Sequence, residues 1–340
     1  MTTAEELPEF FLLSGFLGSG KTTLLLDLLA DGRFGDTGVI VNEVGEINID
    51  GSTVAAARSG LQLAQLSNGC VCCSMMSDLP MTVAALMDEN ERLGRPPLRR
   101  IVLETSGLSR PAPIIRQLLG LPLPFRIAVL STYDCMNGAL NSDRFEEAAA
   151  QLAAAQTIVL TKTDKVGEAA RRAAAEAAAR LNPLALIVDG DRGPERVQAA
   201  FHTPVASETQ FAKMAARNDI AITIEEEPSL HLRMKVFLAR FKGPVAPGKL
   251  FEWLDNLAAY CGPRLLRTKG IVRPDGEQDA ILLQSVGTVF DPPRAIAGDG
   301  TDNAIVIITR DMDLEEFSAI TPELPLEIRD TRKQRPFACT

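Results

Sequence analysis

The chain has 340 residues, 46% of them apolar and 23% charged, a composition typical of a soluble globular protein whose length predicts roughly two domains. Its net charge of −9 disfavours broad binding to nucleic acid or anionic membranes, and no apolar run reaches the ~18 residues that a membrane span needs. The acidic N-terminus does not resemble a secretory signal, and six cysteines in so long a chain do not make a disulfide scaffold, so we expect a cytoplasmic location.

An apolar run over residues 9–15 predicts a buried strand, and residues 21–32 continue with helical spacing that ends at a glycine. The same alternation continues along the chain, with strands predicted at 39–41, 98–104, 125–131, 156–160 and 184–190 and helices at 78–94, 145–155 and 168–183. Apolar strands that alternate with helices predict a largely parallel sheet with helices on both of its faces.

From about residue 194 this pattern breaks, and the mixed stretch that follows predicts a linker. Beyond the linker, the pattern predicts strands over 232–241, 279–290 and 303–310 and helices over 246–262 and 313–320. These elements indicate a smaller α+β domain. The expected division is a first domain over 1–195, a linker over 196–229, a second domain over 230–325 and a loosely held tail over 326–340.

The stretch "GFLGSGKT", residues 15–22, matches the pattern G-x-x-x-x-G-K-T and lies between a predicted strand and a predicted helix, which is the context of a P-loop. Its glycines let backbone N–H groups approach phosphate oxygens, and the helix N-terminus adds a favourable dipole. We expect Lys21 to reach the outer phosphates and the hydroxyl of Thr22 to bind Mg²⁺. The predicted phosphate-binding residues are Gly15, Gly18, Ser19, Gly20, Lys21, Thr22 and Thr23. The first domain is therefore predicted to be a P-loop NTPase domain.

A P-loop site also needs an acid at the end of a neighbouring strand, and "RIVLETSG" supplies Glu104. This carboxylate is predicted to hold Mg²⁺ or one of its waters, while the backbone at Gly107 approaches the terminal phosphate. The alternative is that Glu104 caps the N-terminus of a helix.

The stretch "TKTD", residues 161–164, follows the predicted strand 156–160 and resembles the N/T-K-x-D motif of GTPases, with Thr161 in place of the commoner asparagine. Asp164 is predicted to accept hydrogen bonds from the guanine N1–H and the exocyclic amine, while the stem of Lys162 packs on the base. Adenine lacks this pair of donors, so a buried Asp164 would favour GTP over ATP.

A switch loop is expected in "VNEVGEINIDG", residues 41–51, between the P-loop helix and a cluster of cysteines. Glu43, Glu46 and Asp50 offer hard oxygen ligands or a group that orients water. For Glu46 and Asp50, a solvated acidic loop is an equally good interpretation. Glu43 joins Lys21 and Glu104 in the predicted catalytic set.

The stretch "NGCVCCS" places Cys70, Cys72 and Cys73 within four positions. Three thiolates leave a fourth tetrahedral position for Glu43, a water or a receiving protein, and soft thiolates favour Zn²⁺ or Co²⁺ over Mg²⁺. Because Cys73 points away from the other two thiols in an extended segment, all three converge only if the chain turns there. Redox sensing and plain packing are the alternatives.

The remaining candidate ligands are scattered singly along the chain: Cys135, Cys261, Cys339, His202 and His231. We expect the three cysteines to behave as small apolar residues and the two histidines to be structural.

Five stretches stand in one order, "GFLGSGKTTLL", "NEVGEINID", "NGCVCCS", "ETSGLSRP" and "TKTD", and together they resemble the CobW family of P-loop GTPases, relatives of the hydrogenase and urease nickel-insertion GTPases. The resemblance covers most of the chain and is strongest over residues 10–165. It implies a metallochaperone or metal insertase with zinc or cobalt as cargo, slow GTP hydrolysis as the switch and a client metalloprotein as partner. Many members carry a His-rich stretch between the domains, which this chain lacks.

The predicted function is thus a GTPase that converts GTP and water to GDP and phosphate, uses Mg²⁺, and delivers Zn²⁺ or Co²⁺ to a client protein. A homodimer that depends on nucleotide or metal is a further expectation, whereas binding to nucleic acid or membranes is not expected. The open alternatives are an NTPase with a redox-sensing cysteine cluster, an activator of an iron or cobalt enzyme such as nitrile hydratase, a scaffold without turnover, and a kinase-like transferase.

Overall fold

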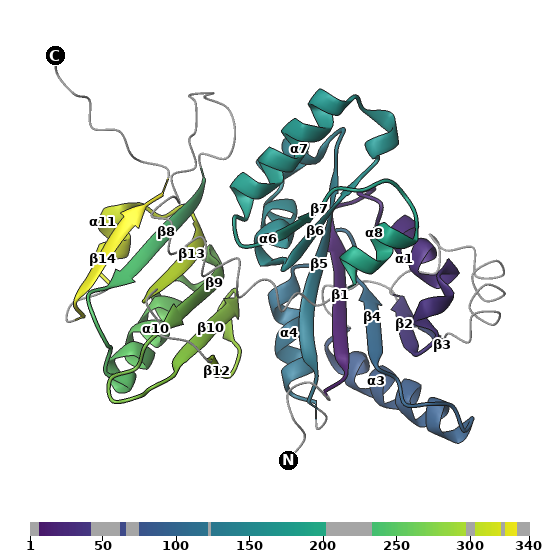
Figure 1. The fold of residues 1–340 in the computed structure, drawn as a ribbon, viewed down its shortest axis with the longest axis horizontal. Coiled ribbons are helices and arrows are strands. Elements are labelled where there is room, and N and C mark those ends of the chain that lie inside the picture. Colours follow the sequence, from purple (N-terminus) through teal and green to yellow (C-terminus); the bar gives the residue numbers. More distant parts are fainter. Residues whose placement is uncertain are drawn as a thin grey trace. The chain divides into compact units, whose positions relative to one another are not determined.

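The computed structural model describes residues 7–41, 62–65, 75–121, 124–201, 233–296, 303–320 and 324–331. The chain divides into two compact units, Met1–Thr203 and Pro204–Thr340, and each unit has its own sheet and its own core (Figure 1).

The first unit is built on a sheet of seven strands in the order β3-β2-β4-β1-β5-β6-β7, and every described pair of neighbouring strands is parallel. The strands are β1 (Glu9–Gly15), β2 (Thr37–Val41), β3 (Gln62–Gln65), β4 (Arg100–Glu104), β5 (Arg126–Asp134), β6 (Thr157–Thr161) and β7 (Leu186–Val188). The central strands are apolar along most of their length, as a parallel sheet covered on both faces requires. The parallel α/β sheet predicted from the sequence is confirmed.

Helices cover both faces of this sheet (Figure 1). Helices α1 and α8 pack together on one face, while α3, α4, α6 and α7 lie on the other. The helices of the first unit are α1 (Lys21–Ala30), α3 (Met75–Arg92), α4 (Pro111–Leu119), α5 (Gly138–Arg144), α6 (Glu146–Ala154), α7 (Glu168–Leu181) and α8 (Pro194–Ala200), with short 3-10 helices η1 (Gly32–Phe34) and η2 (Thr163–Lys165).

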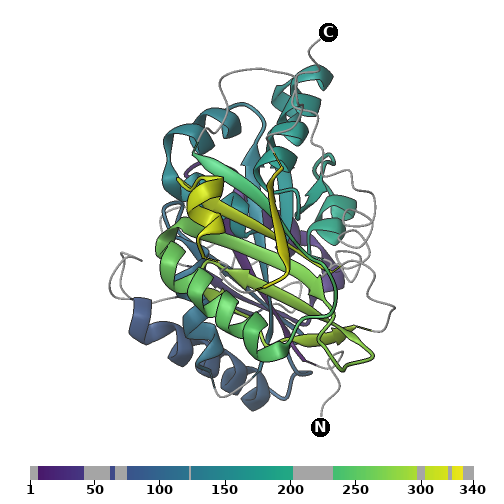
Figure 2. The ribbon, with the colours of Figure 1, turned by 90° about the vertical axis from the view of Figure 1, so that its left-hand side faces the viewer.

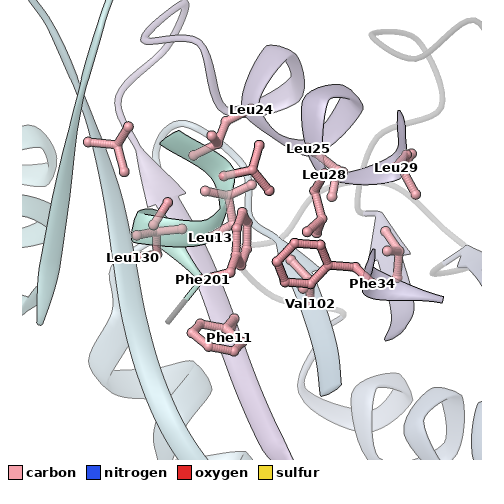
Figure 3. Close-up of a cluster of buried hydrophobic side chains, with 14 of the residues drawn as sticks. Phe11, Leu13, Leu24, Leu25, Leu28, Leu29, Phe34, Val102, Leu130 and Phe201 are labelled. Carbon is pink, nitrogen blue, oxygen red and sulfur yellow. The ribbon is translucent and has the colours of Figure 1, made fainter. Parts of the chain in front are cut away.

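Helix α1 is anchored by four leucines that point into one core cluster with the sheet (Figure 3). Their spacing along the helix places them on a single face. The cluster includes Leu24, Leu25, Leu28 and Leu29 of α1, Phe11 and Leu13 of β1, Val102 of β4, Leu130 of β5 and Phe201 after α8. Burying each leucine contributes about 1.5–3 kcal/mol, so this packing fixes α1 firmly against β1 and holds the turn between them in place.

Helix α8 lies mostly within the stretch 196–229, which was predicted to be a linker, yet it belongs to the core of the first unit. Val197 and Phe201 are buried in the cluster around α1. Arg196, whose side chain is 3% exposed, forms an ion pair with Asp27 of α1 at 2.9 Å. The core of the first unit therefore extends beyond residue 195, where the first domain was predicted to end, and residues 202–229 of the predicted linker lie outside the described part of the chain.

The second unit contains a separate sheet in which every described pair of strands is antiparallel, so the predicted α+β class is also confirmed. Its strand order is β11-β10-β9-β13-β8-β14, with β12 beside β10. The strands are β8 (Met234–Phe241), β9 (Leu265–Val272), β10 (Ala280–Val286), β11 (Val289–Phe290), β12 (Arg294–Ile296), β13 (Ala304–Arg310) and β14 (Leu326–Asp330). Helices α10 (Pro247–Cys261), green, and α11 (Leu314–Ser318), yellow, lie in front of this sheet in Figure 2. The short 3-10 helix η3 (Gly262–Arg264) follows α10.

Two predictions for the second unit differ from the structure. The single strand predicted at 279–290 is a hairpin of β10 and β11, because Gly287 has φ +56° and turns the chain so that Val286 pairs with Val289. The predicted tail at 326–340 begins with β14, whose residues pair with β8. Among the described helices of both units, none combines the length and the apolar character that crossing a membrane requires.

Candidate functional site

Those predicted site residues that the structure describes gather at the carboxyl edge of the parallel sheet in the first unit. Strands β4, β1, β5 and β6 are neighbours in this order, and they end at Glu104, Gly15, Asp134 and Thr161. Because parallel strands all end at the same edge, the loops after these residues meet there. This edge is where open α/β sheets bind their ligands.

The loop between β1 and α1 folds around the side chain of Lys21. Its Nζ donates hydrogen bonds to the carbonyl oxygens of Gly15 at 3.0 Å and Phe16 at 3.2 Å, and the side chain is largely buried. Gly20 has φ +95°, a conformation that residues with a side chain rarely adopt. Among the described residues no side chain caps the N-terminus of α1, so backbone N–H groups dominate this end of the helix, as in anion-binding sites.

Two threonines tie the loop to the neighbouring strands. The hydroxyl of Thr132 on β5 is 2.6 Å from the hydroxyl of Ser19, and the hydroxyl of Thr161 on β6 donates to the carbonyl oxygen of Ser19 at 2.6 Å. A Cβ atom at Gly20 would lie 3.3 Å from the side chain of Thr161. The contact of Thr161 with a nucleotide stays a prediction, and in the structure the residue is buried and its hydroxyl helps to position the loop.

Thr22 and Glu104 are brought together on the metal side of the site. The hydroxyl of Thr22 donates to Oε1 of Glu104 at 2.6 Å, and Glu104 is largely buried. A hydroxyl and a carboxylate are hard oxygen donors, which are the ligands that Mg²⁺ takes beside nucleotide phosphates. The donor set therefore fits Mg²⁺, and Glu104 contacts the P-loop helix rather than capping a helix of its own.

The loop after β4 packs against the P-loop at Gly107. A Cβ atom at Gly107 would lie 2.7 Å from the backbone nitrogen of Leu17 and 2.8 Å from its Cα, closer than side chains allow. Thr105 anchors the start of this loop, since its N–H and its hydroxyl both donate to the carbonyl oxygen of Leu13. Only glycine permits this close approach of two loops.

The predicted base-reading motif follows β6, on the other side of β1 and β5 from Glu104. Lys162, at φ +56°, forms an ion pair with Asp134 at the end of β5, in which Nζ of the lysine lies 2.7 Å from Oδ2 of the aspartate. Asp134 is nearly buried and also accepts from the backbone N–H of Met136 at 2.8 Å. Asp164 lies on η2 and is exposed, whereas the argument for guanine selectivity assumed that it was buried.

The metal and switch predictions fall on residues outside the described part of the chain. These are Glu43, Glu46, Asp50, Cys70, Cys72 and Cys73, and with them His202, His231 and Cys339. Within the described residues, no group of three or more histidine, cysteine or acidic side chains could hold a metal ion.

The two described cysteines are poor candidates for ligands, as expected. Burial raises the pKa of the Cys135 thiol to about 11 and that of the Cys261 thiol to about 11, so both stay protonated near neutral pH. Cys261 is part of the apolar core of the second unit, and its Sγ lies 3.3 Å from Sδ of Met312.

Three residues of this edge were missed by the sequence analysis: Thr132, Asp134 and Gln151. The acid at the end of the β5 sequence was a signal that could have identified Asp134, since the carboxyl ends of parallel strands form the edge where ligands bind. No pattern points to Thr132. Gln151 stands within an alanine-rich helix and carries no sequence signal, but it contacts the loop after β4.

A parallel α/β sheet with a glycine-rich loop between β1 and α1, and an acid from β4 beside the first residues of α1, defines a P-loop nucleotide-binding protein. Residues 9–189 match the family model described as CobW/HypB/UreG, nucleotide-binding domain, and residues 234–320 match the cobalamin synthesis protein cobW C-terminal domain. The chain belongs to the CobW/HypB/UreG family, and the resemblance drawn from its motifs is confirmed.

Relatives with both domains are similar along nearly the whole chain. The zinc chaperone YjiA of Escherichia coli (strain K12) is 29% identical over 323 residues, which cover 91% of this chain and 96% of the relative. The zinc chaperone CobW of Sinorhizobium sp is 27% identical over 340 residues, covering 88% and 92%. The crystal structure of Zn(II)-bound YjiA GTPase from E. coli shares the fold, with a TM-score of 0.65 at 22% identity over 92% of this chain and 98% of that one.

Proposed function

We propose that this protein hydrolyses GTP and uses the hydrolysis to control the delivery of Zn²⁺ or Co²⁺ to a client metalloprotein. The observation that carries the proposal is the contact between Thr22 and Glu104 beside the P-loop, which assembles the donors of a nucleotide-bound Mg²⁺. Family membership and the zinc-chaperone relatives supply the metal part. A homodimer that depends on nucleotide or metal stays a prediction.

In this proposal each residue of the edge has a separate role. The backbone of Gly15, Gly18, Ser19, Gly20, Thr22 and Thr23 binds the phosphates. Lys21 would turn from its carbonyl partners to the outer phosphates, and Thr22 and Glu104 would hold Mg²⁺, whose positive charge would stabilise the negative charge that develops on the GDP leaving group. Gly107 brings the backbone of the loop after β4 next to the terminal phosphate. Glu43 would orient the attacking water.

Guanine selectivity rests on Asp164 and Lys162. The ion pair with Asp134 holds the lysine stem at the end of β6, where it can support a base, and the exposed Asp164 faces solvent from which a base arrives. We expect the protein to use GTP with a kcat/KM at least ~10²-fold above that for ATP, since guanine supplies the two donors from which Asp164 would accept and adenine does not. Parallel phosphate-release assays with the two nucleotides measure this ratio.

A matched pair of variants sharpens the measurement. Asp164→Ala should bring the ratio of GTP to ATP use close to one, whereas Glu168→Ala, which removes an exposed acid at the start of α7, should leave it unchanged. Equal use of GTP and ATP by the unchanged protein would contradict the assignment of the guanine site and favour the kinase-like alternative.

The coupling of nucleotide to metal is supported by the strand register. Gln65 at the end of β3 pairs with Val41 of β2, and Val41 pairs with Glu104 of β4, so the three residues lie in one row. Strands are spaced about 4.8 Å apart, which separates Gln65 from Glu104 by roughly 10 Å. Cys70 follows Gln65 by five residues, a length of chain that spans up to ~17 Å. This length of chain is enough for Cys70 to reach the nucleotide edge in the proposed arrangement.

The proposed cycle uses this proximity. Bound GTP orders the stretch that contains Glu43, which follows the end of β2, and this arrangement brings Cys70, Cys72 and Cys73 into a geometry that binds the metal cargo. Hydrolysis of GTP removes the contacts that order this stretch and lowers the metal affinity of the cysteines, so the metal passes to the client protein. By thermodynamic linkage, the metal must in turn favour the binding of GTP.

The coupling predicts a difference in zinc affinity between nucleotide states. Zinc titrations in the presence of a non-hydrolysable GTP analogue should give a Kd lower than those with GDP, by a factor within the ~5–150-fold typical of allosteric coupling. The reverse titration is the control, because zinc must raise the affinity for the analogue by the same factor. Equal zinc affinities in the two states would rule the coupling out.

A further inference from the structure

Helix α6 is hydrogen-bonded to the loop that follows β4 through one buried side-chain amide, that of Gln151. Nε2 of Gln151 donates to the carbonyl oxygen of Gly107 at 2.9 Å and to that of Ser109 at 2.9 Å, and Gln151 is completely buried. The two carbonyl groups lie on either side of Leu108. Both hydrogens of the amide are therefore used to fix the path of the loop at the glycine that touches the P-loop.

The oxygen of the same amide indicates why glutamine occupies this position: its role lies in the two hydrogen bonds that the nitrogen donates. Oε1 of Gln151 is buried and has no hydrogen-bond partner among the described residues. An unsatisfied buried oxygen is costly, so an apolar side chain would serve packing better at this position. The presence of glutamine is explained by its two donors and by the carbonyl groups that they hold.

Two further contacts connect α6 with the same pair of loops. Phe145, at the start of α6, stacks on Phe16 of the P-loop with ring centroids 4.7 Å apart. Arg110, at the end of the loop after β4, pairs with Glu146 at 3.0 Å and with Glu147 at 3.4 Å, both in the first turn of α6. The helix thus holds the P-loop and the loop after β4 in one fixed relation.

Gly107 is the point at which this relation affects chemistry. Its backbone is pressed against the backbone of Leu17, so a displacement of the loop by a fraction of an ångström changes its distance from the P-loop. Ser109 N–H donates to the carbonyl oxygen of Ser106, which makes the loop a tight turn with Gly107 at its tip. The amide of Gln151 holds both this tip and the residue where the turn closes.

We propose that Gln151 is a positioning residue. It fixes the position of the Gly107 backbone relative to the terminal phosphate of GTP and thereby sets the rate of GTP hydrolysis. The inference rests on the proposed function. Because only GTP has a terminal phosphate next to Gly107, Gln151 should affect the affinity for GTP more than the affinity for GDP, although it contacts neither nucleotide. Its effect belongs to the triphosphate state and to turnover, and not to nucleotide binding in general.

The test compares Gln151→Met with Gln156→Met. Methionine keeps the length of the side chain and removes both donors. Gln156 follows α6, and its partly buried side-chain oxygen accepts a hydrogen bond from the N–H of Val129 on β5 at 2.6 Å, so it is a control for the loss of a glutamine side-chain hydrogen bond elsewhere in the first unit. We expect Gln151→Met to lower kcat by about 10- to 100-fold, the scale of a misplacement of ~1 Å, and to leave the Kd of GDP within about twofold.

Binding measurements separate positioning from a structural role. Gln151→Met should weaken the affinity for a non-hydrolysable GTP analogue more than that for GDP, whereas Gln156→Met should change neither ratio nor kcat. An equal loss for both nucleotides, or an unchanged kcat, would overturn the inference. If the unchanged protein binds GTP without hydrolysing it, the proposed function fails, while the ratio of analogue to GDP affinity still tests the role of Gln151.

A second variant protects the test against a failure of Gln151→Met to fold. The carboxyl group of Gln151→Glu has the same shape as the amide and donates one hydrogen bond only when it is protonated. Its kcat relative to that of the unchanged protein should therefore fall as pH rises, whereas the same ratio for Gln156→Met should not vary with pH. A ratio that is independent of pH for Gln151→Glu would contradict the proposal.

Discussion

Replacing Lys21 by methionine is expected to lower the kcat of GTP hydrolysis by about 10²–10³-fold, the loss seen when one preorganised donor is removed from a developing charge. Lys21 is the lysine of the P-loop motif, and its ammonium group lies among the loop carbonyls, where we expect the outer phosphates to bind. Methionine keeps the buried stem, so the loss reports the charge and not the packing. Phosphate release at saturating GTP measures the effect.

The matched control is Lys242→Met, which removes an exposed lysine from the second unit and should leave kcat unchanged. Thermal unfolding of both variants shows whether the fold is intact. If Lys21→Met keeps a turnover within a few-fold of the unchanged protein, the assignment of the P-loop as the hydrolytic site is wrong.

Serine in place of both Cys70 and Cys72 should weaken zinc binding by at least ~10²-fold, because removing a ligand costs more than the 10–100-fold lost when an outer contact is removed. Serine offers a hydroxyl that stays protonated and binds Zn²⁺ poorly, while it preserves the size of the side chain. Competition with a chromogenic zinc chelator gives the affinity of the unchanged protein and of the variant.

Cys135→Ser is the control for thiol content. Burial raises the pKa of this thiol to about 11, so it is a weak ligand near neutral pH and its loss should leave the zinc affinity unchanged. If the double variant binds zinc as tightly as the unchanged protein, the motif is not the zinc site and the metal proposal fails, which favours the redox-sensing alternative.

The helices and strands that could be predicted from the sequence are those whose buried positions are mostly apolar. Apolar runs such as the one in β1, and the leucines of α1, produce the periodicities of a covered parallel sheet and its helices. Strand β3, "QLAQ", has no such run, because it lies at the edge of the sheet. Strand β9 was not predicted, since its apolar run is interrupted by Arg267 and Lys269, which are nevertheless buried.

The site divides in the same way. Residues whose chemistry is tied to a motif, such as Lys21, Thr22 and Glu104, were identified from spacing, and the structure brings Thr22 and Glu104 into contact. Thr161 was identified by its motif but assigned to the nucleotide, because a motif does not reveal which neighbour a hydroxyl selects. Gln151 could not be found, since its role depends on where the fold places α6 and not on the sequence around it.

The position of β3 has a consequence for how the two halves of the proposed cycle can work in one domain. Among the described strands, β3 is held by β2 alone, while β4, β1 and β5 are each held on two sides. Detaching β3, a strand of four residues, breaks the hydrogen bonds to one neighbouring strand only. The free energy of this local opening is therefore far lower than the free energy of detaching an interior strand. In the proposed cycle, a local rearrangement beside β3 therefore leaves the ladders of β4, β1 and β5 intact, and these strands carry the P-loop and the loop after β4.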